Sequence, residues 1–242
     1  MIAIDVLTNE MPETLVRGAT ISQCRCNGTE ATTLEQAPCT LVLLAHWCDV
    51  PAARERSVKL DDVLAPSDVA LGGDDAVAHV VDLWDGTYHE IGRDASTGRW
   101  AERLRAPRVA RRSASLLAVH VAPRGLPRFL GSDMHASGGA VELQRFTYTR
   151  GIQNNSVVSR GAPSSPTARP PGAVRWSACA VLSLGREDFG RVLLHLPGSR
   201  SPPRVSGDAS LPESACHRIG KCAWSVPVRV RASGMSWLML EW

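Results

Sequence analysis

Apolar and polar residues alternate most regularly near the C-terminal end of the chain. From Val174 to Leu184 every second residue is apolar, and polar residues occupy most of the positions between. Residues 224–230 alternate in the same way. A period of two is typical of a half-buried strand. We therefore expect a C-terminal antiparallel β unit, and Pro227, which lacks an N–H, predicts that its strand lies at a sheet edge.

The N-terminal half carries continuous apolar runs instead of alternation. The runs Leu41–Trp47 and Ala76–Trp84 have the length of buried strands, and Asp85-Gly86 is a turn signal after the second run. Residues 10–40 are polar and predict a loop, whereas residues 52–63 combine helix formers with a weak apolar stripe and predict a helix. The expected fold class is therefore α+β, with an N-terminal mixed α/β region, a C-terminal antiparallel β unit and long irregular loops.

Charge is divided unevenly along the chain. The net charge is +3, but residues 1–95 hold 16 acidic and 6 basic groups, whereas residues 96–242 hold 8 acidic and 21 basic groups. Residues 160–172 contain four prolines and no large apolar residue, which is the composition of a linker. We expect four regions: an acidic N-terminal region (1–95), an arginine-rich region (96–159), a Pro/Ser-rich linker (160–172) and a β-rich C-terminal region (173–242).

Arginine supplies nearly all of the positive charge, because the chain has 25 arginines and only two lysines. A dense arginine segment attracts phosphates and indicates contact with nucleic acid. The first hypothesis is therefore a small nucleic-acid-associated protein that uses the segment formed by Arg99, Arg103, Arg105, Arg108, Arg111, Arg112, Arg124 and Arg128. GC-rich coding DNA explains the same skew, since Ala, Gly and Pro are also abundant. The second hypothesis is accordingly a spurious reading frame with no selected function.

The densest cluster of metal-ligating and acid–base residue types spans residues 79–90. It comprises His79, Asp82, Asp85, His89 and Glu90. Imidazole and carboxylate groups bind divalent metals and transfer protons, so the third hypothesis is a small metal-assisted enzyme that uses this cluster. If residues 76–84 form a strand, His79 and Asp82 point to opposite faces, and only a helix brings them together. Asp82 or Asp85, at the strand end, is then the favoured acid–base group.

The seven cysteines predict free thiols rather than a metal site. Cys24, Cys26, Cys39 and Cys48 follow the spacing C-x-C-x12-C-x8-C, with His46 nearby. Structural zinc sites use cysteine pairs separated by two to four residues, which this spacing does not offer. We expect no metal ligands among these cysteines.

Neither a membrane span nor an export signal is recognisable. No stretch approaches the roughly 18–20 consecutive apolar residues that cross a bilayer. The N-terminal residues lack the positive and apolar regions of a signal peptide. We therefore expect a cytoplasmic protein with no membrane contact.

Overall fold

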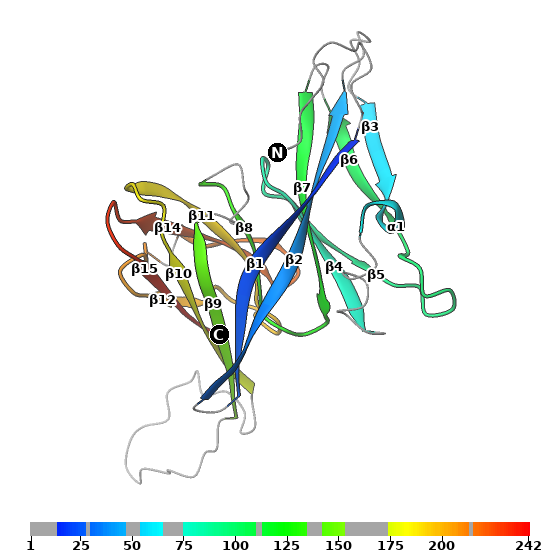
Figure 1. Ribbon diagram of the computed structural model, residues 1–242. Coiled ribbons are helices and arrows are strands. Elements are labelled where there is room, and N and C mark those ends of the chain that lie inside the picture. The colour runs from blue at the N-terminus through cyan, green and yellow to red at the C-terminus, as the bar shows by residue number, and fades with distance from the viewer. Residues whose placement is uncertain are drawn as a thin grey trace.

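The protein is built almost wholly from β-strands (Figure 1). The computed structural model describes residues 14–27, 30–46, 54–64, 75–109, 113–134, 142–152, 174–212 and 215–242. These residues form fifteen strands and one helix, α1 (Leu60–Val63), of four residues. The predicted α+β class with a mixed α/β N-terminal region is therefore wrong. A stripe of few apolar residues does not stabilise a helix of several turns, and strand pairing satisfies the same backbone groups.

Nine strands form the larger sheet. Their order across the sheet is β12 (Arg204–Ser206), β15 (Ser236–Glu241), β10 (Val174–Leu182), β9 (Leu143–Ile152), β1 (Thr14–Asn27), β2 (Glu30–His46), β7 (Ser113–Pro123), β4 (Ala76–Asp82) and β5 (Tyr88–Gly92). All neighbouring strands pair antiparallel except β1 and β9, which pair in parallel. The longest strands, β1 and β2, cross the middle of the molecule in Figure 1.

Two smaller sheets pack against the larger one. The first has the order β13 (His217–Gly220), β14 (Ala223–Val230), β11 (Asp188–His195) and β8 (Arg128–Ser132), with every pair antiparallel. The second is the antiparallel pair of β3 (Arg54–Lys59) and β6 (Arg103–Val109), which lies beside α1.

Residues predicted to be a polar loop form the longest strands. The range 10–40 includes β1 and most of β2, which pair with each other from Thr14↔Leu44 to Asn27↔Glu30. Strand formation depends on cross-strand partners more than on intrinsic preference, so a polar sequence without a visible period still enters the sheet. The range 52–63, predicted to be helical, contains β3 and only the single turn of α1.

Most of the predicted strands are present, but one predicted position is wrong. The run that begins at Leu41 lies in β2, Ala76–Trp84 contains β4, and the two alternating C-terminal segments become β10 and β14. The edge position predicted from Pro227 is wrong, because β14 lies between β13 and β11. Since β13 pairs only with residues 223–225 of β14, Pro227 lies beyond its end, where that ladder requires no N–H.

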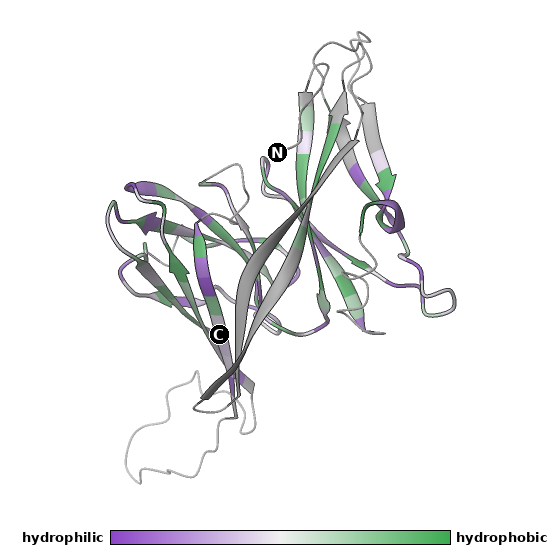
Figure 2. Ribbon diagram, viewed as in Figure 1, coloured by the Kyte–Doolittle hydropathy of each residue, from purple (hydrophilic) through white to green (hydrophobic). Residues whose placement is uncertain are grey.

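The hydrophobic core has two parts that share β4 and β7. One part joins the nine-stranded and four-stranded sheets and includes Phe129, Phe146 and Trp224. The other part lies against β3, β6 and α1 and includes Leu60 and Leu104. All seven residues of β4 are buried, because its two faces contribute to different parts of the core. Figure 2 accordingly shows hydrophobic residues along β4 and β7.

With four residues, α1 is far too short to span a bilayer, and the described residues contain no membrane-spanning helix.

We expect that Phe129→Ala destabilises the protein by roughly 3–5 kcal/mol, because it removes a fully buried ring that packs against Phe146. The free energy of unfolding from urea denaturation measures the change. Phe189→Ala is the matched control: Phe189 is 60% exposed and its ring contacts the Arg229 guanidinium, so the loss stays below about 1 kcal/mol. Equal losses in the two variants would contradict the core described above.

Candidate metal centre

The hairpin of β4 and β5 places the first two members of a candidate site opposite each other. His79 on β4 is the register partner of Glu90 on β5, so their side chains share one face of the sheet. Tyr88, two residues before Glu90, points to that same face. The turn between the strands contains Gly86 at φ +72°, a conformation that favours glycine.

Asp82 fixes this hairpin instead of joining the site. Its Oδ1 accepts hydrogen bonds from the backbone N–H groups of Trp84 (2.9 Å) and Asp85 (3.4 Å). Its Oδ2 accepts a bond from the Ser115 hydroxyl on β7 at 2.6 Å. These bonds occupy both carboxylate oxygens, so Asp82 serves the turn and holds β4 to β7.

The same register continues across the larger sheet. His79 pairs with His120 on β7, and His120 pairs with Cys39 on β2. Glu90, His79, His120 and Cys39 therefore form one row over four adjacent strands, with all side chains on one face. Three of these four residues are almost completely buried, whereas the Glu90 side chain is 28% exposed. The row is thus open to solvent at the β5 end.

The four-stranded sheet contributes the third candidate ligand, His195, at the end of β11. His195 pairs with Arg128 on β8 and with Ala223 on β14, so these three side chains also share a face. The His195 ring lies 4.5 Å from the His79 ring, measured between ring centroids. This contact brings together residues that are more than a hundred positions apart in the sequence.

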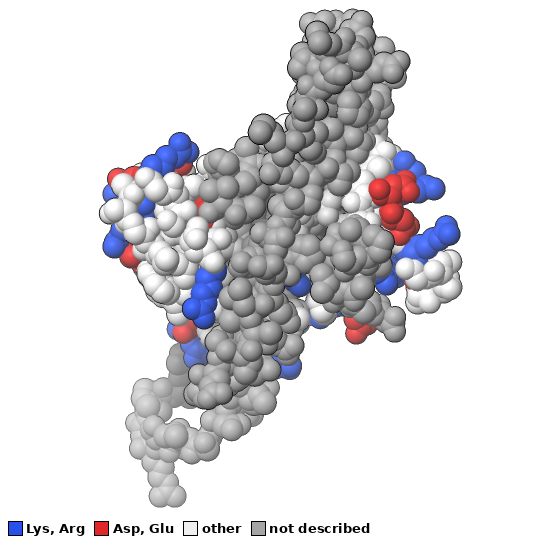
Figure 3. Space-filling model, viewed as in Figure 1, with Lys and Arg blue, Asp and Glu red and all other residues white. Residues whose placement is uncertain are grey.

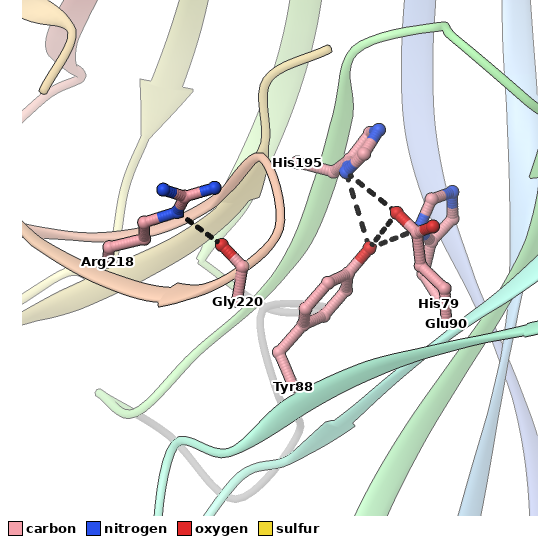
Figure 4. Close-up of polar contacts among 6 residues, drawn as sticks. All are labelled: His79, Tyr88, Glu90, His195, Arg218 and Gly220. Atoms are coloured by element: carbon pink, nitrogen blue, oxygen red, sulfur yellow. Dashed lines mark hydrogen bonds and ion pairs between the residues drawn. The ribbon is translucent and has the colours of Figure 1, made fainter. Parts of the chain in front are cut away.

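His79, Glu90 and His195 converge on one point (Figure 4). Their ligand atoms all lie within 4.8 Å of one another. The Glu90 Oε1 lies 4.0 Å from His79 Nδ1 and 3.6 Å from His195 Nδ1. Two imidazoles and one carboxylate are the protein ligands of catalytic zinc sites, and on one face they bind ferrous iron. Such a set leaves coordination positions open for water or substrate.

The Tyr88 hydroxyl lies between these three ligand atoms. It donates a hydrogen bond to Glu90 Oε1 at 2.7 Å, and its oxygen lies 2.8 Å from His79 Nδ1 and 3.3 Å from His195 Nδ1. The single hydroxyl proton is used toward Glu90, so the two imidazoles donate to the tyrosine oxygen. The hydroxyl therefore satisfies all three groups at once.

Gly220 on β13 determines where the Tyr88 ring lies. A Cβ atom at this glycine would come within 2.3 Å of Tyr88 Cδ1. Figure 4 shows the Tyr88 hydroxyl pointing to the three ligands. A side chain at position 220 would therefore displace the Tyr88 ring.

Burial keeps the imidazoles of this region neutral. It lowers the pKa of His79 well below its usual range, and the positive fields of His195, Arg128 and His120 act in the same direction. Burial also lowers the pKa of His195 to about 4, against the opposing effect of Glu90. Burial first, and then the hydrogen bond to Glu90, raises the pKa of Tyr88. Two neutral imidazoles and a neutral phenol thus surround the Glu90 carboxylate.

Two buried imidazole nitrogens in the described part of the chain have no hydrogen-bond partner. One is His79 Nε2, on the side of the ring away from Tyr88. The other is His120 Nδ1, because His120 Nε2 donates to the Leu130 carbonyl at 2.7 Å. Buried polar atoms without partners are uncommon, and each one calls for an explanation such as a catalytic role or a bound water or ion.

The predicted 79–90 cluster therefore separates into members and non-members of the site. His79 and Glu90 belong to it, whereas Asp82 and Asp85 stabilise the turn. His89 pairs with Val80 and points to the opposite face of the sheet. The prediction missed His195 and Tyr88: no local pattern marks His195, whereas Tyr88 lies on the face of Glu90 by strand alternation alone.

The predicted arginine segment is spread over several elements. Arg99, Arg103, Arg105 and Arg124 are exposed, and Arg128 is buried. Arg108 lies in β6, where its side chain is not described, and Arg111 and Arg112 lie outside the described residues. On the face shown in Figure 3, the described basic side chains occupy separate places. Nucleic-acid binding by this segment stays a prediction.

The cysteines predicted to be free thiols are described in part. Among the described residues, Cys39, Cys179, Cys216 and Cys222 form no disulfide bond. The side chains of Cys24 and Cys26 are not described, and Cys48 lies outside the described residues.

Comparison of the chain with protein-family models, curated proteins and solved structures found no match. The site must therefore be interpreted from its own geometry.

We expect metal-free protein to lose stability as the pH falls from 6.5 toward 4, in part because of His120. Burial and the charge of Arg128 lower the pKa of His120 from 6.5 to about 4. Between pH 6.5 and 4 the His120 imidazole is protonated in the unfolded chain but not in the folded protein. The stability present above pH 6.5 is therefore lost on acidification.

The variant His120→Gln isolates this contribution, because its amide N–H still donates to the Leu130 carbonyl. The free energy of unfolding should vary less with pH between 6.5 and 4, with a slope smaller by about 1.4 kcal/mol per pH unit at most. Urea denaturation across this range, with a chelator present, gives the measurement. Identical pH profiles for the two proteins would show that His120 is not held neutral by burial.

Proposed function

We propose that the protein binds a divalent transition-metal ion through His79, Glu90 and His195, and that it uses the open coordination positions of the ion in a metal-assisted reaction on a small molecule. The observation that carries the proposal is the convergence of these three ligand atoms, within 4.8 Å of one another, from three strands of two sheets. The proposal retains the hypothesis of a metal-assisted enzyme that uses residues 79–90, but His195 takes the place of Asp82 and Asp85.

The protonation of the site supports metal binding. A metal ligand must be a neutral imidazole or a charged carboxylate, and burial keeps both imidazoles neutral. The partnerless His79 Nε2 has the lone pair, so the Nδ1 proton can move there when Nδ1 becomes a ligand. His79 and His195 are buried, whereas the Glu90 side chain is 28% exposed.

Tyr88 must leave the centre of the set for an ion to enter. The ligand atoms lie 2.7–3.3 Å from its oxygen, whereas zinc–nitrogen and zinc–oxygen bonds measure about 2.0–2.2 Å. The three ligands would hold an ion only after the phenol had turned aside and the ligand atoms had moved closer together. The displaced hydroxyl would then be available to hold a water or substrate by a hydrogen bond.

A bound divalent ion supplies a Lewis acid and lowers the pKa of water at an open position. Glu90 provides the single negative charge of the ligand set and lies on the solvent-exposed side, where a small molecule reaches the site. His79 and His195 hold the inner side of the set.

We expect the metal-free protein to bind one equivalent of Zn²⁺ and to become more stable by about 2.7 kcal/mol when free zinc exceeds the dissociation constant 100-fold. Glu90→Gln should weaken zinc binding by at least about tenfold, because it removes the ligand charge and keeps the side-chain shape. Isothermal titration calorimetry and thermal unfolding with and without Zn²⁺ provide the readouts.

Two matched variants serve as controls. Glu102→Gln removes an exposed carboxylate outside the site, and His89→Ala removes a histidine from the opposite face of β5. Both should bind zinc like the unchanged protein. Absence of stoichiometric zinc, or equal loss in Glu90→Gln and Glu102→Gln, would reject the metal centre and leave the cluster as a hydrogen-bond network.

A further inference from the structure

Two histidines on adjacent strands of the larger sheet each hold a buried nitrogen that has no partner. His79 on β4 is the register partner of His120 on β7, so their Cβ atoms are about 4.5–5.5 Å apart and their side chains share one face. His79 is 1% exposed and His120 is 0% exposed. Among the described residues, Nε2 of His79 and Nδ1 of His120 have no hydrogen-bond partner. The two atoms belong to neighbouring side chains, so one explanation can serve both.

The hydrogen bonds of the two rings determine which nitrogen carries the proton. His120 Nε2 lies 2.7 Å from the Leu130 carbonyl, which can only accept, so this nitrogen carries the proton. His79 Nδ1 donates to the Tyr88 oxygen at 2.8 Å. A neutral imidazole has a single N–H, so His79 Nε2 and His120 Nδ1 are both acceptors in the metal-free protein. Two acceptors form no hydrogen bond with each other.

Coordination through Nδ1 changes the hydrogen bonding of His79. A ligand nitrogen carries no proton, so the ring proton passes from Nδ1 to Nε2 and the ring stays neutral. Nε2–H is then a buried donor, and buried donors require an acceptor. The adjacent His120 Nδ1 is such an acceptor. The two rings therefore complement each other in the metal-bound form, whereas they do not in the metal-free form.

From this arrangement we propose that His120 is a positioning residue of the metal centre. Its Nδ1 accepts a hydrogen bond from the Nε2–H of metal-bound His79, directly or through one buried water. The inference rests on the proposed metal centre and adds a residue that does not touch the ion. A metal-binding histidine usually donates its other N–H to such a partner, which fixes the ring orientation and raises the basicity of the ligand. The Leu130 carbonyl holds His120 in turn, so the hydrogen bonds run from the ligand to the backbone of β8.

The zinc affinity of three variants, measured by isothermal titration calorimetry, tests the role of His120. His120→Phe keeps a ring but offers no acceptor, so the dissociation constant for Zn²⁺ should rise about 10–100-fold. His120→Gln provides an amide oxygen as acceptor and an N–H for the Leu130 carbonyl, so it should recover part of the affinity. Leu104→Ala removes a fully buried side chain from the other part of the core and controls for lost stability. Its zinc affinity should equal that of the unchanged protein.

Nitrogen NMR of protein labelled with ¹⁵N-histidine gives a readout that a merely structural role of His120 would not change. The ¹⁵N chemical shifts show which ring nitrogens carry a proton. We expect Zn²⁺ to move the His79 proton from Nδ1 to Nε2 and to shift the His120 Nδ1 resonance, because this atom gains a hydrogen bond. The exposed His217 serves as the internal control, and its resonances should not respond.

The possible failures lead to different conclusions. If the unchanged protein binds no stoichiometric zinc, the metal centre itself is rejected. If zinc binds but His120→Phe keeps the same affinity, or the His120 Nδ1 resonance does not respond, this inference alone is overturned. If circular dichroism shows that His120→Phe does not fold, the nitrogen spectra of the unchanged protein decide the matter.

Discussion

Polar groups buried between two sheets must satisfy one another's hydrogen bonds, and this requirement fixes how the larger and the four-stranded sheets meet. A buried imidazole or phenol without a partner costs about 1–3 kcal/mol, so His79, Tyr88 and His195 select one relative placement of β4, β5 and β11. His120 acts at the same interface. Leu130, which has no register partner because β8 is irregular there, leaves its carbonyl free to accept the His120 bond.

Local patterns predict the strands whose signal lies within a single segment. The alternation in β10 and the apolar run in β4 are of this kind, because each reports the burial of its own side chains. The strand β1 and the first part of β2, residues 30–40, have no such signal: they are strands because they pair with each other. A helix over residues 52–63 fails for the same reason, since β6 offers β3 a partner from a distant part of the sequence.

Only the part of the candidate site that lies in the β4–β5 hairpin can be predicted from the sequence. Alternation separates His79 from Asp82, and pairing around the Asp85-Gly86 turn brings His79 to Glu90. His195 joins through the packing of two sheets, which no local spacing encodes. The arginines show the opposite case, in which residues close in the sequence are separated by the fold. Arg128 belongs to a dense run in the sequence, yet it lies apart from its exposed neighbours because β8 carries it into the interior.

The long sequence separation between Tyr88 and His195, 107 positions, has a consequence for the order of folding. The β4–β5 hairpin is local and can close early, whereas the contact to β11 requires the closure of a much longer loop. During synthesis the complete ligand set exists only after β11 has left the ribosome and docked. For the proposed metal centre, a partly synthesised chain therefore offers only the pair His79 and Glu90, and the third ligand is in place only in the finished fold.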